Sequence, residues 1–347
     1  MPIPRTVRHL AGPLFAAAVL CCLLAASRPV AAQQPYHILD RWKLADTGGW
    51  DYLLVDSPAH HLYITRGDHV DVLDTTTGKR VGTISGLKGT HGVALDPAGK
   101  LGYISDGRGN AVVVFDRSTL AVVATIPAGT NPDAIIYEPA TKTVWAFNGR
   151  SNNISVIDAA TQKVIATIPV PGKPEFAVAD GKGTVFNNIE DKNEIIRINA
   201  RSKTVTATWP ACESPSGLAL DISGSRLFSV CDGKKMAVLD SNSGKILATP
   251  AIGDGPDAAG WSEKHKLAFA SCGEGVLSVV DASSAGYKTI QTLPTQQSAR
   301  TMTYDPATDR IYTVAAKFGP RPAPTPENPR GWPPMIPGSF TVIVIGR

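Results

Sequence analysis

Short apolar segments that end in Asp or Asn recur along the chain at an almost constant interval. Six of them end at Asp74, Asp116, Asp158, Asn199, Asp240 and Asp281, so the interval is 41 or 42 residues. A seventh segment, TVIVIG, ends at Gly346, and an insertion at 317–338 explains its larger separation. Self-similarity at one period indicates a repeat architecture in which each unit is a small supersecondary motif.

Each repeat divides into four short strands separated by turn residues. In the third repeat the strands fall at 134–137, 144–147, 154–157 and 164–168, and Val, Ile, Ala and Phe dominate them. Gly, Pro, Asp and Asn punctuate the pattern, as expected between strands. Four antiparallel strands repeated seven times predict an all-β fold, a seven-bladed β-propeller whose blades bury one another's faces. Two separate β-sandwiches would not give one uniform period.

The two ends of the repeat array predict how the ring closes. The last repeat stops after its third strand at Arg347, and the segment 36–44 precedes the first complete innermost strand. We expect 36–44 to supply the fourth strand of the last blade. Pairing the first and last segments in this way removes an open sheet edge.

The first 32 residues read as a secretory signal. Arg5 and Arg8 precede an apolar stretch at 10–26, and small residues then offer a cleavage site before Gln33. The alternative, a membrane anchor, would need roughly 20 apolar residues, and a glycine and a proline interrupt this stretch. We therefore expect a single propeller domain at 33–347 that is periplasmic or secreted, monomeric and without a membrane span.

The net charge of the chain limits the classes of partner that it is expected to bind. The net charge of +4 arises from 34 Lys and Arg against 30 Asp and Glu, and it falls to +1 without Arg5, Arg8 and Arg28 of the signal segment. Capture of nucleic acid or of anionic lipid needs clustered positive charge. The composition therefore favours a protein or small-molecule partner and argues against nucleic acid.

Export would place the remaining cysteines where disulfides form. Cys212 lies in the loop that leads into a blade, and Cys231 ends the second strand of the same blade. Both should lie on one face, so a Cys212–Cys231 bridge is one expectation, and the alternative is that they stay unpaired. Cys272 aligns one residue beyond Cys231, which should turn it to the other side of the pleat.

Segments such as LYIT (62–65), VWAFN (144–148) and IYTV (311–314) recur at the second strand, and VIDAATQKVIATIPVPGKP (156–174) continues the pattern. These motifs resemble the repeats of the YVTN-type, YncE-like β-propeller family of exported bacterial proteins. The resemblance covers the mature chain and implies the propeller fold. It implies no catalytic residue, because the defining motif is structural.

Candidate chemistry lies where the chain leads into each innermost strand, since these seven positions should converge on the mouth of the channel. They are Asp51, His91, Asp133, Glu175, Ser216, Asp257 and Arg300. Six are ionisable and four are acidic, so crowding should perturb their pKa values and could bind a cation or a polar small molecule. The alternative is that they only hydrate the channel. The irregular mix favours a ligand, because a structural ring could repeat one residue type.

Two further features fall on the same face. A second ring at the ends of the second strands comprises Arg66, Ser105, Asn148, Cys231, Ser271 and Ala315, and the member from the remaining repeat is ambiguous around Asn188. Arg66 could hold an anionic group or simply lie on the surface. The proline-rich insertion 317–338, with Trp332 at its apolar tip, could close over the mouth, dock a partner, or be a solvated loop.

These observations support three hypotheses of function. The first is an exported scaffold that binds a protein or a small ligand at the channel mouth, with Trp332 contributing. The second is a propeller-type hydrolase, such as a lactonase, or a cyclase, with His91 and Glu175 as acid and base and Arg300 as an anion clamp. The third is an accessory protein of a periplasmic redox system, with no cofactor of its own.

Overall fold

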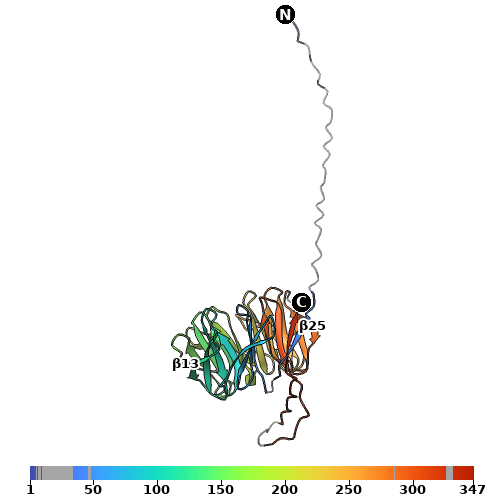
Figure 1. Ribbon diagram of the computed structural model, residues 1–347. Coiled ribbons are helices and arrows are strands. Elements are labelled where there is room, and N and C mark those ends of the chain that lie inside the picture. The colour runs from blue at the N-terminus through green and yellow to red at the C-terminus, as the bar shows by residue number, and fades with distance from the viewer. Residues whose placement is uncertain (5, 7–8, 10–33, 46–47, 285, 326–330) are drawn as a thin grey trace. The chain divides into compact units, whose positions relative to one another are not determined.

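Seven four-stranded antiparallel sheets make up the regular structure of the protein in its computed structural model (Figure 1). The structure describes residues 1–4, 6, 9, 34–45, 48–284, 286–325 and 331–347. It separates two units, Met1–Gln34 and Pro35–Arg347, and every named strand lies in the second. Most of the predicted signal segment, 1–32, lies outside the described residues. Among the described residues, no helix has the length and apolar character that a membrane crossing requires.

The blades follow one another along the chain, each running from its innermost to its outermost strand. The first three are β2 (Leu53–Asp56), β3 (His61–Thr65), β4 (Val70–Asp74) and β5 (Arg80–Ile84); β6 (Thr90–Leu95), β7 (Leu101–Asp106), β8 (Ala111–Asp116) and β9 (Val122–Pro127); and β10 (Pro132–Glu138), β11 (Thr143–Asn148), β12 (Asn153–Asp158) and β13 (Lys163–Pro169).

The next three blades are β14 (Pro174–Ala179), β15 (Thr184–Ile189), β16 (Glu194–Asn199) and β17 (Thr204–Pro210), with the 3-10 turn η1 (Glu190–Lys192) after β15; β18 (Pro215–Asp221), β19 (Arg226–Cys231), β20 (Lys235–Asp240) and β21 (Ile246–Ala248); and β22 (Pro256–Ser262), β23 (Leu267–Cys272), β24 (Val276–Asp281) and β25 (Lys288–Pro294). The last blade contains β26 (Met302–Asp305), β27 (Arg310–Ala315), β28 (Thr341–Gly346) and β1 (His37–Lys43).

Position within a blade explains the pattern of burial. Every residue of β11 is buried, whereas the outermost strand β13 exposes most of its residues, including Val164 and Ile165. Neighbouring blades cover both faces of the middle strands, and those strands are accordingly continuous apolar runs. At the turn after β12, the carboxylate of Asp158 accepts the backbone N–H of Thr161 at 2.7 Å, as its place before a turn predicts.

The ring is closed, as the sequence predicted. The innermost strands contact one another in the order β2, β6, β10, β14, β18, β22 and β26, and β26 returns to β2. In the last blade β1 pairs with β28, from His37 opposite Gly346 to Lys43 opposite Thr341. The N-terminal strand therefore completes the last blade, and equivalent positions of all blades meet around one axis.

The hydrophobic core lies between the blades. One cluster joins Tyr103 and Val114 of the second blade to Val144 and Ala146 of the third, and all four side chains are almost fully buried. Burial of this kind repeats between the other blades. Since each interface depends on both neighbours, the ring holds its inner loops in fixed positions.

The cysteines lie near the mouth face. Cys212 and Cys231 form a disulfide with their Cα atoms 5.8 Å apart. Cys272 is a buried free thiol. The predicted one-residue offset of Cys272 is wrong: Cys231 pairs with Pro215 and Cys272 with Pro256, so the two cysteines hold equivalent positions in adjacent blades. Burial raises the pKa of the Cys272 thiol to about 12, which keeps it protonated.

Candidate functional site

A β-bulge places most of the converging residues at the start of their strands. The seven residues are called the mouth ring here: Asp51, His91, Asp133, Glu175, Ser216, Asp257 and Arg300. In β10 the pairing with β11 slips between Pro132 and Ile135, and Asp133 lies within this slip. The same slip follows Pro174 and Pro215 in their strands. A proline fixes φ at the start of the strand, and a bulge turns the next side chain out of the ladder.

Polar side chains of one blade hold the mouth-ring backbone of the next. Four bonds to main-chain carbonyl groups recur: Thr65 to His91 (2.9 Å), Ser105 to Asp133 (2.5 Å), Asn188 to Ser216 (2.7 Å), and Ser271 to Arg300. The assignment of Ser105 and Ser271 to the same ring as Arg66 is wrong. Strand pairing puts them one residue earlier, and such an offset turns a side chain to the other face of the sheet.

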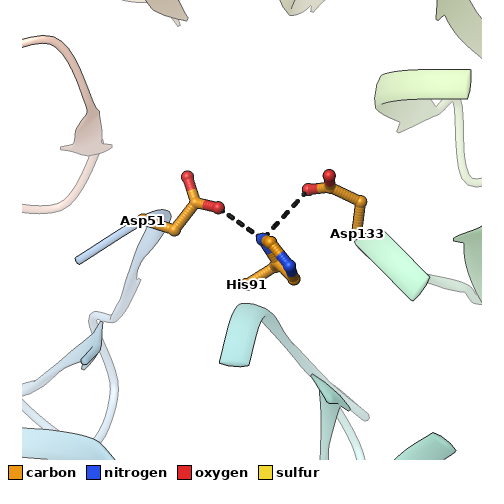
Figure 2. Close-up of side chains that lie close together, drawn as sticks. All are labelled: Asp51, His91 and Asp133. Carbon is orange, nitrogen blue, oxygen red and sulfur yellow. Dashed lines mark hydrogen bonds and ion pairs between the residues drawn. The ribbon is translucent and has the colours of Figure 1, made fainter. Parts of the chain in front are cut away.

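Three mouth-ring side chains from adjacent blades form a compact cluster (Figure 2). His91 Nδ1 lies 2.6 Å from Asp51 Oδ2 and 3.5 Å from Asp133 Oδ1. Burial opposes the charge on the imidazole, but the hydrogen bond to Asp51 and the charge of Asp133 outweigh it and raise the pKa of His91 to about 9. The imidazole is therefore protonated at neutral pH. Burial raises the pKa of Asp133 above its ordinary value, and the charge of His91 opposes this.

Asp51 continues the network toward the last blades. Arg300 Nη2 lies 3.8 Å from Asp51 Oδ1, and the same guanidinium forms an ion pair with Asp257. Ser216 donates a hydrogen bond to Asp257 Oδ1 at 2.9 Å. Burial raises the pKa of Asp257, although the charge of Arg300 opposes that shift. Six of the seven mouth-ring residues are thus linked through their side chains, and Glu175 is the seventh.

Glu175 occupies the remaining part of the mouth ring. Lys173 Nζ lies 2.6 Å from Glu175 Oε1 and also pairs with Glu190, while the hydroxyl of Tyr52 donates to Glu175 Oε2 at 3.2 Å. Burial and the nearby charge of Asp133 raise the pKa of Glu175 well above that of a free glutamate, and Lys173 opposes this. His91, Glu175 and Arg300 therefore share one mouth, and each has its own partners.

Tyr52, Lys173 and Trp50 were not predicted as site residues. Tyr52 packs edge-on against Phe176 below the mouth ring, and its pKa is raised well above the ordinary value, first by burial and then by the charge of Glu175. Only their place in the sequence could have indicated a role at the site, because each of the three lies within two residues of a mouth-ring residue. Aromatic residues beside a strand gave no further indication of a role.

Arg66 does not hold a surface anion, and the expectation of an exposed side chain is wrong. Its side chain is buried and forms an ion pair with Asp71 at 3.3 Å, while Nε donates to the carbonyl of Gly49 at 3.2 Å. The guanidinium lies 3.7 Å from the centre of the Phe340 ring. Arg66 thereby fixes the loop that carries Trp50, whose indole also packs against Phe340.

A cleft opens beside Arg300, between the mouth and the proline-rich insertion. Its volume is about 1180 Å³. The base of the insertion forms a short antiparallel pair, in which Phe318 lies opposite Met335, and Phe318 packs against Trp50. Trp332 lines the cleft and exposes 61% of its surface. Met335 lies at the base of the insertion, and residues 326–330 lie outside the described part.

The mouth ring can also hold a cation. One ligand atom from each of Asp51, His91 and Asp133 lies within 4.8 Å of the others. Nitrogen and carboxylate donors of this kind suit a transition metal such as zinc. The cation would have to displace the proton of His91, which the raised pKa of that imidazole opposes at neutral pH.

Comparison with known proteins identifies the fold. No family model and no curated protein sequence matches the chain. Among solved structures, hydrazine synthase of Kuenenia stuttgartiensis superposes with a TM-score of 0.69 at 16% identity and covers 77% of this chain and 93% of its own. U3-55K superposes with a TM-score of 0.72 at 9% identity and covers 89% of this chain and 98% of its own. At such identities the likeness establishes the β-propeller fold and nothing finer.

Proposed function

We propose that this chain is an exported binding protein of the YVTN type that recognises a small ligand at the mouth face of its propeller. The repeat motifs support the family, and the basic and apolar N-terminal segment supports export. The bridge between Cys212 and Cys231 fits an oxidising compartment, where disulfides persist. A propeller is a scaffold whose function lies in the site that it carries, so the proposal rests on the mouth.

One observation carries the proposal: six of the mouth-ring residues form a connected polar network that adjoins a large cleft. Arg300 belongs to both, because it pairs with Asp51 and Asp257 in the network and also lines the cleft. Concave sites with a few convergent polar groups and perturbed pKa values are typical of ligand binding. A concave site favours a small ligand over a protein partner, whose interface would be broad.

The direct experiment is a thermal-shift screen of the purified protein against metal ions and small organic compounds. A ligand that binds only the folded state raises the unfolding temperature. We expect hits whose shift is lost in Arg300→Gln and His91→Gln, and is kept in Lys163→Gln, which alters an exposed residue of the outer strand β13. If the shift in unfolding temperature is the same in Arg300→Gln and His91→Gln as in the wild type, the compounds bind elsewhere, and this result would contradict the proposal.

A hydrolase or cyclase is the second candidate, and the state of Glu175 favours it. A buried carboxyl whose pKa is raised by burial can stay protonated and act as a general acid. His91, Arg300 and Glu175 face the same mouth. Turnover of a small lactone that is lost in Glu175→Gln would support catalysis. Unchanged turnover in that variant would exclude Glu175 as its acid.

A further inference from the structure

The cleft beside Arg300 differs in charge from the mouth ring that it adjoins. Three of its lining residues are cationic, namely Arg300, Lys317 and Arg321. None of the lining residues that the structure describes is an aspartate or a glutamate. Arg300 is already engaged by Asp257 and Asp51. Lys317 and Arg321 are exposed and form no ion pair with any described residue.

The rest of the wall is apolar and partly aromatic. Trp50, Phe318, Trp332, Met335 and Ile336 line it. The rings of Trp50 and Phe318 lie 6.0 Å apart. The backbone around Phe318 is held by the pairing at the base of the insertion, where Gly319 donates to the carbonyl of Pro334 at 2.8 Å. Aromatic walls held in this way favour flat apolar groups, which bind by stacking and by burial of surface.

We propose that this cleft binds a small organic anion with a flat apolar body, such as an aromatic carboxylate. The apolar body would lie against the aromatic wall around Trp50 and Trp332. The carboxylate would face Lys317 and Arg321, whose charges are not neutralised by a described neighbour. The volume of about 1180 Å³ fits a small molecule. This inference rests on the proposed function and names the class of ligand at the same face.

The test is a calorimetric titration of the full chain with 2-naphthoate, with its uncharged analogue 2-naphthamide as the comparison. We expect the carboxylate to bind at least about tenfold more tightly than the amide, as a charge-assisted contact provides. We expect its affinity to fall as the salt concentration rises from about 0.02 to about 0.5 M, because the two cations are exposed to solvent.

Variants of the cleft residues test where 2-naphthoate binds. The double variant Lys317→Gln and Arg321→Gln should weaken 2-naphthoate about tenfold and leave 2-naphthamide unchanged. Trp332→Ala should weaken both compounds by a similar factor. Lys163→Gln, which also removes one exposed positive charge, should change neither. All of these residues are exposed, so the substitutions should leave the fold intact. Unchanged unfolding temperatures of the variants check this.

Each other outcome overturns the inference. Equal affinity for the carboxylate and the amide would show that the charge of the ligand is not recognised. An affinity for 2-naphthoate that is unchanged in both the double variant and Trp332→Ala would show that the anion binds outside the cleft. If naphthoate does not bind while a metal ion or another compound stabilises the protein through Arg300 or His91, the inference fails and the proposed function stands. A dimer that Trp332→Ala dissociates would assign the cleft to a second copy of the chain.

Discussion

The two ends of the innermost strands carry similar residue types and use them differently. Five residues after each mouth-ring residue, the chain turns at the opposite face, and the residues there are Asp56, Asp96, Glu138, Asp180, Asp221, Ser262 and Asp305. We call these seven residues the turn ring. Six of them are acidic, whereas the mouth ring also contains a histidine, a serine and an arginine. One ring repeats almost a single residue type and the other varies.

The difference lies in what the carboxylates bind. Five of the six turn-ring carboxylates accept backbone N–H groups of their own turns, as Glu138 does from Thr141 at 2.8 Å and Asp221 from Gly224 at 2.9 Å. The sixth, Asp56, pairs with the side chain of Arg117. In the mouth ring, the described bonds of the carboxylates all come from side chains, such as His91 and Ser216. A repeated acid therefore marks turn chemistry. A varied ring whose carboxylates bond only to side chains is consistent with the ligand site that we propose.

The largest effect is expected in the turn ring. Asp221 is buried and pairs with Arg226 at 2.5 Å. Asp221→Ala would leave that guanidinium without its carboxylate and uncap the turn, so the free energy of unfolding should fall by about 3 kcal/mol. Urea unfolding followed by circular dichroism measures the loss. A loss below about 1 kcal/mol would remove the structural role that we assign to the turn ring.

A second effect depends on pH and belongs to the mouth ring. His91 has a pKa of about 9 in the folded protein, because Asp51, Asp133 and Glu175 face it. In the unfolded chain its pKa has the ordinary value of about 6.5. Its stabilising contribution is complete below pH of about 6.5 and is lost as the pH rises through about 9. We expect the wild type to lose about 2 kcal/mol more than His91→Gln over this range.

The measurement is the free energy of unfolding of the wild type and of His91→Gln, each at pH values of about 6 and about 9.5. The raised pKa values of Asp133 and Glu175 also lower stability as the pH rises, and both carboxyls are present in the two proteins. His91→Gln also removes the charge that lowers the pKa of Asp133, so the difference between the proteins reports on His91 together with its coupling to that carboxyl. Parallel pH profiles would show that the imidazole has no raised pKa.

The smallest effect on stability is expected for Asp257→Asn. Arg300 keeps Asp51 as a neighbour and is 43% exposed, so solvent screens its charge. The unfolding free energy should change by less than about 1 kcal/mol. The same variant should alter the shifts in the ligand screen, because it frees a charge beside the cleft. A loss as large as that of Asp221→Ala would make the two rings equivalent and contradict the comparison.

Periodicity was enough to predict the fold, because each strand repeats the same local pattern and the closing pair lies at the two ends of the array. It also aligned the mouth ring correctly, since prolines mark several of the positions. Arg66 was assigned wrongly because its burial depends on Phe340, which is far away in the sequence. The cleft was not predictable from spacing, because it arises where an insertion without a counterpart in the other blades packs against Trp50.

Hydrogen exchange with and without bound 2-naphthoate measures directly whether the mouth face is the binding face. We expect slower exchange in peptides that cover 48–52 and 317–321, and unchanged exchange at the turn ring, for example in peptides that cover 221–226. Protection confined to the turns at the opposite face would contradict it.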